Sequence, residues 1–313
     1  MKERYVREIL SGFPYPILVY FTKLRTDECL DPGPLRLKYI LATSESISRY
    51  FAMAALSEFR HVAENGNLEP PSSLTADFVK QFRRPSWGIW VHILREILKC
   101  LHRAEVDLVM PELMGFFFEK KLTETEAASA LQELLKIRNQ LSHDKIKAMN
   151  MADFKTLCDQ TMELLEEVLE SMEFLLDYEL TFISKIEVNK RRKVPPTYLH
   201  KISKLVGNSE AFQGDRLHMD ELIDSSSILL RSLESGQHLN LDPFMVYEST
   251  AGKAPDIFFF NGLKKPGVAE YSACNHGGVF ISEESERADV IAEELQELEA
   301  LFTRSAAGEL VNG

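Results

Sequence analysis

Apolar residues along the first 178 positions recur at three- and four-residue intervals, which is the spacing of amphipathic helices. Two long segments, 31–60 and 151–180, keep this spacing from end to end, and each predicts a long helix. Shorter helices are predicted over 11–24, 74–82, 85–103, 111–120 and from about Thr125 onward. Residues 1–178 are therefore expected to form an all-α helical bundle.

Near residue 180 the pattern changes to one that is typical of β-strands. The segment 180–188 alternates apolar and polar residues, and short runs rich in β-branched and aromatic residues continue as far as 277–282. The segment 262–273 contains a Pro-Gly turn between two such runs and predicts a hairpin. A closing helix is then predicted by the spacing of Ile291, Leu295, Leu298 and Phe302.

These patterns predict an α+β protein of two domains, a helical bundle over residues 1–178 and a smaller β-rich domain over 179–313. A chain of 313 residues with 45% hydrophobic content is long and apolar enough for both cores. A barrel is one arrangement open to the short strands, with the closing helix packed against it. Because no run of about 18 uncharged apolar residues occurs, we expect no membrane span.

Charge is unevenly distributed along the chain. The formal net charge is −12, but the segment 283–299 holds eight acids and one Arg, so the remainder is much less acidic. A small basic site for a phosphodiester is therefore compatible with the composition. Lys190, Arg191, Arg192 and Lys193 form the densest basic run; a solvated linker between the domains and an RNA contact explain it equally well. The acidic segment favours a protein partner for the β-rich domain.

Cysteine usage points to a reducing compartment. The four cysteines are far apart and include no CxxC pair, which favours reduced thiols in a cytoplasmic protein. The first ten residues carry charges on both sides of a few apolar residues and do not resemble a signal peptide. Cys274 and His276 lack a second pair of metal ligands at usable spacing, so a tight turn is expected there.

The familiar signatures of cofactor and nucleotide chemistry are missing from the sequence. It contains no P-loop, no GxGxxG motif after a strand and no GxSxG motif. We therefore expect no cofactor and no metal.

One stretch, LKIRNQLSHDK at 134–144, combines residues suited to phosphate chemistry. Arg138 offers a permanent cation, Asn139 an amide, and His143 the side chain that titrates near neutrality. With Leu134 at zero, Arg138 lies at about 40° on the helical wheel, inside the apolar stripe. A structural ion pair, or a stem that packs on the core while the guanidinium reaches solvent, is the simpler explanation of that position.

The wheel also sets a geometric condition for a shared site. On one continuous helix Arg138 and His143 point about 140° apart. To act together they need a helix break near Ser142, or a second subunit whose His143 lies beside Arg138 of the first.

The R-N-x-x-x-H pattern of Arg138, Asn139 and His143, at the end of one helix and just before another long amphipathic helix, resembles a HEPN domain. The resemblance covers about residues 1–178 and leaves the β-rich domain unrecognised. It implies a metal-independent endoribonuclease that works as a homodimer, with two motifs meeting across a cleft. Arg138 would bind the phosphate, His143 would act as general base or acid for attack by the substrate 2′-OH, and Asn139 would orient His143 or contact the phosphate.

The resemblance also implies a cellular role and an alternative. A free ribonuclease endangers its own cell, so a regulated place in phage defence or in a toxin–antitoxin pair is expected, with the β-rich domain sensing a trigger or holding an inhibitory partner. The alternative is a non-catalytic HEPN-like scaffold that binds nucleotides, RNA or proteins, with Arg138 in a structural pair.

Overall fold

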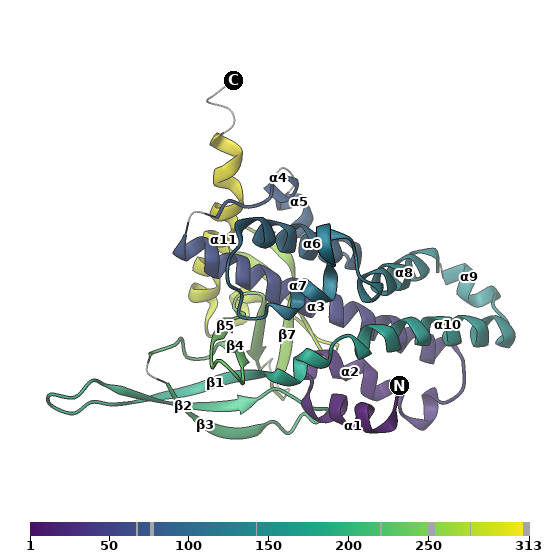
Figure 1. Ribbon diagram of the computed structural model, residues 1–313, viewed down its shortest axis with the longest axis horizontal. Helices are drawn as coiled ribbons and strands as arrows, with labels where there is room; N and C mark the ends of the chain where they lie inside the picture. Colours follow the sequence, from purple (N-terminus) through teal and green to yellow (C-terminus); the bar gives the residue numbers. More distant parts are fainter. Residues whose placement is uncertain are drawn as a thin grey trace.

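The computed structural model describes residues 1–66, 68–75, 78–141, 143–219, 221–249, 254–275 and 277–308. Its helices come first, its strands follow, and one long helix ends the chain, so the α+β fold class is confirmed (Figure 1). The helices of the first half are α1 (Glu3–Gly12), α2 (Tyr15–Leu24), α3 (Pro34–Asn65), α4 (Ser72–Thr75), α5 (Phe78–Arg83), α6 (Trp87–Ala104), α7 (Glu112–Phe117), α8 (Glu126–Gln140), α9 (His143–Ala148) and α10 (Met151–Glu170).

The second half consists of two antiparallel sheets and the closing helix. The strands are β1 (Tyr178–Asn189), β2 (Thr197–Lys204), β3 (Gln213–Met219), β4 (Ile228–Ser232), β5 (His238–Asn240), β6 (Met245–Glu248), β7 (Asp256–Lys265), β8 (Val268–Ala273) and β9 (Val279–Ile281), followed by α11 (Ala288–Gly308). Their orders are β3-β2-β1-β4-β5 and β6-β7-β8-β9. Within the described residues the strands do not close on themselves, so the barrel-like arrangement is wrong.

The helix expected to run to residue 180 ends ten residues earlier. The Ser171 N–H donates to Glu167 O (3.2 Å), and a single 3-10 turn, Glu173–Asp177, leads into β1. Tyr178 then pairs with Ser232 of β4, and its hydroxyl donates to the Glu112 carboxylate (2.6 Å). This pairing across the chain decides the conformation, because the apolar spacing of the segment suits a helix equally well.

The centre of α3 is the most deeply buried part of the chain. Every residue from Tyr50 to Phe59 is at most 3% exposed. Phe51 packs on Phe116 of α7 (ring centroids 5.1 Å apart), whereas Phe59 packs on Phe302 of α11 (5.5 Å). Buried side chains from both halves of the chain belong to one cluster, so the core continues across the boundary expected at residue 178.

Arg49 ties α3 to the second sheet. Its guanidinium donates to Phe260 O (3.2 Å) and to Ser272 Oγ (2.9 Å), and it lies 4.9 Å from the centre of the Phe259 ring. Burial lowers the pKa of Arg49, and the negative charge of Glu45 opposes that shift. The contact holds the helical half against β7 and β8.

The closing helix α11 buries the four residues that predicted it, Ile291, Leu295, Leu298 and Phe302. No described helix is both long enough and apolar enough to cross a membrane, in agreement with the sequence-based expectation. Cys29, Cys158 and Cys274 are buried and Cys100 is partly exposed, and all four are free thiols. His276 lies outside the described residues, so the turn expected around it is not observed directly.

One buried carboxyl on α3 predicts a pH dependence of stability. Glu58 is 2% exposed, and its Oε1 accepts from the Met110 N–H (2.9 Å). Burial raises its pKa from 4.5 to about 7, although hydrogen bonds from the backbone of Met110 and Val109 oppose the shift. The folded state therefore binds more protons than the unfolded state between these values, and the free energy of unfolding falls as pH rises through that window.

We predict that Glu58→Gln removes this dependence, because glutamine has the shape of the protonated acid and no charge. At pH 8 the variant should be more stable than the wild type by up to about 3 kcal/mol, and at pH 5 the difference should be small. Urea unfolding at both pH values measures it, with the exposed Glu119→Gln as the control. An equal change in stability at pH 5 and pH 8 would contradict the assignment.

Candidate functional site

Helix α8 carries Arg138 and Asn139 in its last turn. Thr125 caps its start by accepting a hydrogen bond from the Ala128 N–H (3.1 Å). The helix packs against α3 and α10 through a buried stripe of Ala127, Ala130, Leu131, Leu134 and Ile137. Arg138 follows the last of these residues.

The structure contains a helix break between Arg138 and His143, which is one of the two conditions for these residues to act together. Helix α8 ends at Gln140, Leu141 is extended (φ −86°, ψ 98°), and α9 begins at His143. The chain therefore changes direction between the two candidate residues. Ser142 and the side chain of His143 lie outside the described part of the structure, so the direction of the imidazole is not described.

Arg138 is exposed, although the helical wheel places it in the apolar stripe. Ile137, the preceding residue of the stripe, is buried, whereas Arg138, Asn139 and Gln140 at the end of the helix are all exposed. The Arg138 Nη1 donates to Asn139 Oδ1 (3.2 Å), and Arg138 makes no ion pair among the described residues. A structural ion pair buried in the core therefore does not explain this arginine.

A groove of about 570 Å³ receives Arg138 and Asn139. It lies between the first half of α3 and the junction of α8 with α9. Its polar side chains are Lys38, Glu45, Arg138 and Asn139, and its apolar floor is formed by Pro34, Leu37, Leu41, Ala42, Leu141 and Ile146. Two cations, one amide and one carboxylate thus share a small cleft, a set suited to a phosphate and a neighbouring hydroxyl.

Lys38 and Glu45 were not candidates from the sequence. They lie seven residues apart on α3, two turns along one face, and nothing local connects them to residue 138. The sequence feature that could have identified them is recognisable only once the structure is known. It is the set of polar residues in the first half of the 31–60 segment, on the face opposite Leu37 and Ile40. Glu45 also contributes negative charge that opposes the lowering of the Arg49 pKa.

A second groove, about 550 Å³, lies on the other side of the α8–α9 junction. It is formed with α10 and contains Glu133 and Asp153 beside Ile137, Met149 and Leu157. Its charged side chains are acidic, so of these two grooves the one with Arg138 is the better receptor for an anion.

The basic run lies at the tip of a β-hairpin. Lys190, Arg191, Arg192 and Lys193 connect β1 to β2, which are neighbours in one sheet. The alternative of a linker between domains is therefore wrong. Figure 1 shows this hairpin projecting on the side of the molecule away from α8 and α9, so one chain does not bring Lys190–Lys193 to Arg138.

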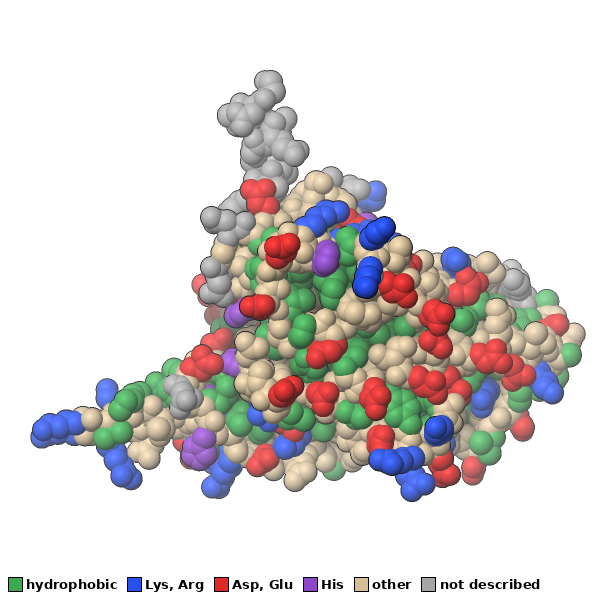
Figure 2. Space-filling view, viewed as in Figure 1, with side chains coloured by type: hydrophobic (Ala, Val, Ile, Leu, Met, Phe, Trp, Pro, Cys, Tyr) green, Lys and Arg blue, Asp and Glu red, His purple; other side chains and the backbone are tan. Residues whose placement is uncertain are grey.

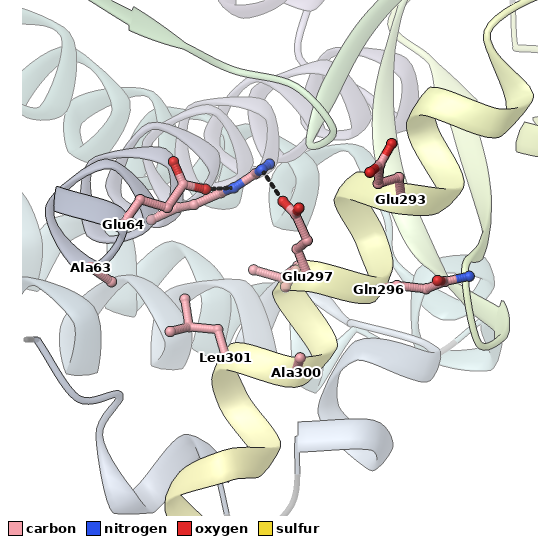
Figure 3. Close-up of a pocket in the computed structure, with 9 residues that line it drawn as sticks. Ala63, Glu64, Glu293, Gln296, Glu297, Ala300 and Leu301 are labelled. Carbon is pink, nitrogen blue, oxygen red and sulfur yellow. Dashed lines mark hydrogen bonds and ion pairs between the residues drawn. The ribbon is translucent and has the colours of Figure 1, made fainter.

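The third pocket, about 730 Å³, lies between the end of α3 and the acidic helix α11 (Figure 3). Arg60 of α3 pairs with Glu64 (2.5 Å), with Glu297 (3.1 Å) and with Glu294. Arg60 thus neutralises part of the negative charge of segment 283–299, the charge that suggested a protein partner. Among the described residues, no group of three or more His, Cys, Asp or Glu side chains is placed to hold a metal ion.

Comparison with known proteins gives no relative: no family model, no curated protein and no solved structure matches the chain. The interpretation of the Arg138 groove therefore depends on its residues and geometry.

We predict that Arg138→Ala leaves stability nearly unchanged, within about 0.5 kcal/mol, because the side chain is exposed and makes no ion pair among the described residues. The matched control, Arg49→Ala, should cost about 2–4 kcal/mol, since it removes two hydrogen bonds and a ring contact from the core. Urea unfolding measures both variants. A loss of about 3–5 kcal/mol for Arg138→Ala would restore the buried-pair explanation.

Proposed function

We propose that the protein is a metal-independent endoribonuclease of the HEPN type, and that the groove with Arg138 is its active site. The observation that carries this proposal is the exposure of Arg138 in a groove shared with Asn139 and Lys38, immediately before the helix break that leads to His143. An arginine kept for a buried ion pair would instead be paired and covered.

Arg138, Lys38 and His143 each have a role in the proposed cleavage of RNA. The guanidinium of Arg138 binds the non-bridging oxygens of the scissile phosphate, and Lys38 adds a second positive charge at the same cleft. His143 takes the proton from the 2′-OH, whose oxygen attacks phosphorus while the bond to the 5′-oxygen breaks. The leaving 5′-oxygen receives a proton, and the products are a 2′,3′-cyclic phosphate and a 5′-hydroxyl.

Two proton transfers favour a site built from two chains. The attacking 2′-OH needs a base and the leaving oxygen needs an acid, and each chain offers one histidine in the motif. A homodimer that joins two Arg138 grooves supplies both, with Asn139 holding the neighbouring polar groups in place. We further infer a regulated role, in phage defence or a toxin–antitoxin pair, because unrestrained RNA cleavage harms the cell that makes it.

We predict cleavage of RNA by the purified protein in EDTA, with 2′,3′-cyclic phosphate ends. His143→Ala and Arg138→Ala should each lower the rate at least about a hundredfold, the usual range for an acid–base group and for a transition-state donor. Gel analysis of total RNA and tRNA, with chemical mapping of the new ends, measures both the rate and the products.

Matched control variants separate the site from a general effect of charge. His102 and Arg103 are also exposed and also lie in the last turn of a helix, α6, so His102→Ala and Arg103→Ala should keep full activity. Cleavage that survives in His143→Ala, or that requires a divalent metal, would contradict the proposal. Wild-type protein that binds RNA without cutting it would favour the scaffold alternative.

A further inference from the structure

The hairpin formed by β1 and β2 extends beyond the body of its sheet. Pairing of β1 with β4 ends at Phe182 and Ile228, whereas pairing of β1 with β2 continues to Asn189 and Thr197. The outer part of the hairpin, residues 185–201, is named the arm here. Strand β3 accompanies β2 as far as Tyr198, which pairs with Met219, so only residues 189–197 extend beyond all other strands. Figure 1 shows the arm projecting from the molecule, and Figure 2 shows Lys and Arg side chains gathered at its end.

The arm is basic in an acidic protein. Residues 185–201 include six Lys or Arg residues and one Glu, while the whole chain has a net charge of −12. The cations near the body are partly neutralised, because Lys201 and Lys185 share Glu187 (2.8 and 3.5 Å). The four at the tip, Lys190–Lys193, are exposed and make no ion pair within the described part of the chain.

Local backbone features hold the tip in a defined turn. The Val194 N–H bonds to Arg191 O (3.4 Å), and Lys193 has a left-handed backbone (φ 67°). Pro195 and Pro196 follow and restrict the return of the chain into β2. The four charges are therefore presented together at the end of a two-stranded ribbon, with less freedom to lose on binding than a disordered tail would have.

We propose that the arm binds the phosphodiester backbone of a nucleic-acid duplex. Clustered Lys and Arg side chains neutralise phosphates and release counterions, which is the main source of affinity for nucleic acids. Single strands are usually held by stacking on exposed aromatic rings, whereas the rings of the arm, Tyr198 and His200, are partly buried and buried respectively. The chemistry of the arm therefore selects a duplex over a single strand.

This binding surface is separate from the Arg138 groove and does not require that groove to be catalytic. The arm and the α8–α9 junction lie on opposite sides of one chain. The test is therefore made in protein that carries Arg138→Ala, so that duplex binding is measured without RNA cleavage, and the cleavage assay of the proposed function remains a separate experiment.

The experiment compares fluorescence anisotropy of a 24-base-pair RNA duplex, a DNA duplex of equal length and a single-stranded RNA. The arm variant combines Lys190→Gln, Arg191→Gln, Arg192→Gln and Lys193→Asn. The control variant combines Arg4→Gln, Arg7→Gln, Lys120→Gln and Lys121→Asn, which removes the same charge from exposed positions elsewhere. Lys121, like Lys193, has a left-handed backbone (φ 65°), so the two variants are matched in strain as well.

The arm variant should bind duplexes at least about tenfold more weakly at 0.1 M salt, and the negative slope of log K against log salt should become less steep by about 3 to 4. The control variant should bind like its parent, and single-stranded RNA should bind more weakly than either duplex. Tighter binding of the RNA duplex than of the DNA duplex would identify RNA as the source of the phosphodiester, and the reverse would identify DNA.

Several results would overturn the proposal. They are failure of the parent protein to bind either duplex, an equal loss in the control variant, and preference of the arm for single-stranded RNA. Arm-dependent binding to vesicles of anionic lipid without binding to duplexes would assign the arm to a membrane surface instead. Circular dichroism of both variants establishes that the fold is intact.

Discussion

Burial of helix α3 on all sides is the constraint on which the rest of the structure depends. Its centre, Tyr50 to Phe59, is closed off from solvent by the helical bundle on one side and by α11 on the other. A helix that is covered all round is expected to be apolar all round, and in this segment only Ser57 and Glu58 depart from that rule. Its two ends leave the core, and each forms one wall of a groove, with Lys38 and Glu45 near the start and Arg60 near the end. The helix that joins the two halves thus also positions the candidate site.

Most helices and several strands could be predicted because their signals are local. The spacing of apolar residues indicates α2, α8 and α11, and the Pro-Gly turn indicates the β7–β8 hairpin. Strand β3 gave no such signal, because five of its seven residues are polar or glycine and it is held by pairing with β2. The predicted end of α10 lies too far along the chain for a similar reason, because residues 178–182 pair with β4 in the sheet. Pairing partners distant in sequence decide both cases.

The candidate site could be predicted only in part. Arg138, Asn139 and His143 follow from one short stretch of sequence, which left open whether a helix break near Ser142 or a second subunit brings them together. Lys38 and Glu45 did not, because α3 and α8 meet only through tertiary packing. A helical wheel gives the direction of a side chain but not whether another element covers it, which is why Arg138 was expected near the core and is exposed. The basic run was ambiguous because its composition suits a linker and a hairpin tip equally well.

The central claim is that the Arg138 groove cleaves RNA by attack of the neighbouring 2′-OH, and a substrate altered at one atom tests it most directly. A short RNA that the purified protein cuts in EDTA is synthesised again with a single 2′-deoxyribose on the 5′ side of the mapped bond. The account predicts that cleavage stops at that bond and continues at others in the same molecule. Continued cleavage at the 2′-deoxy position would contradict it, because a water molecule, and not the substrate hydroxyl, would then be the nucleophile.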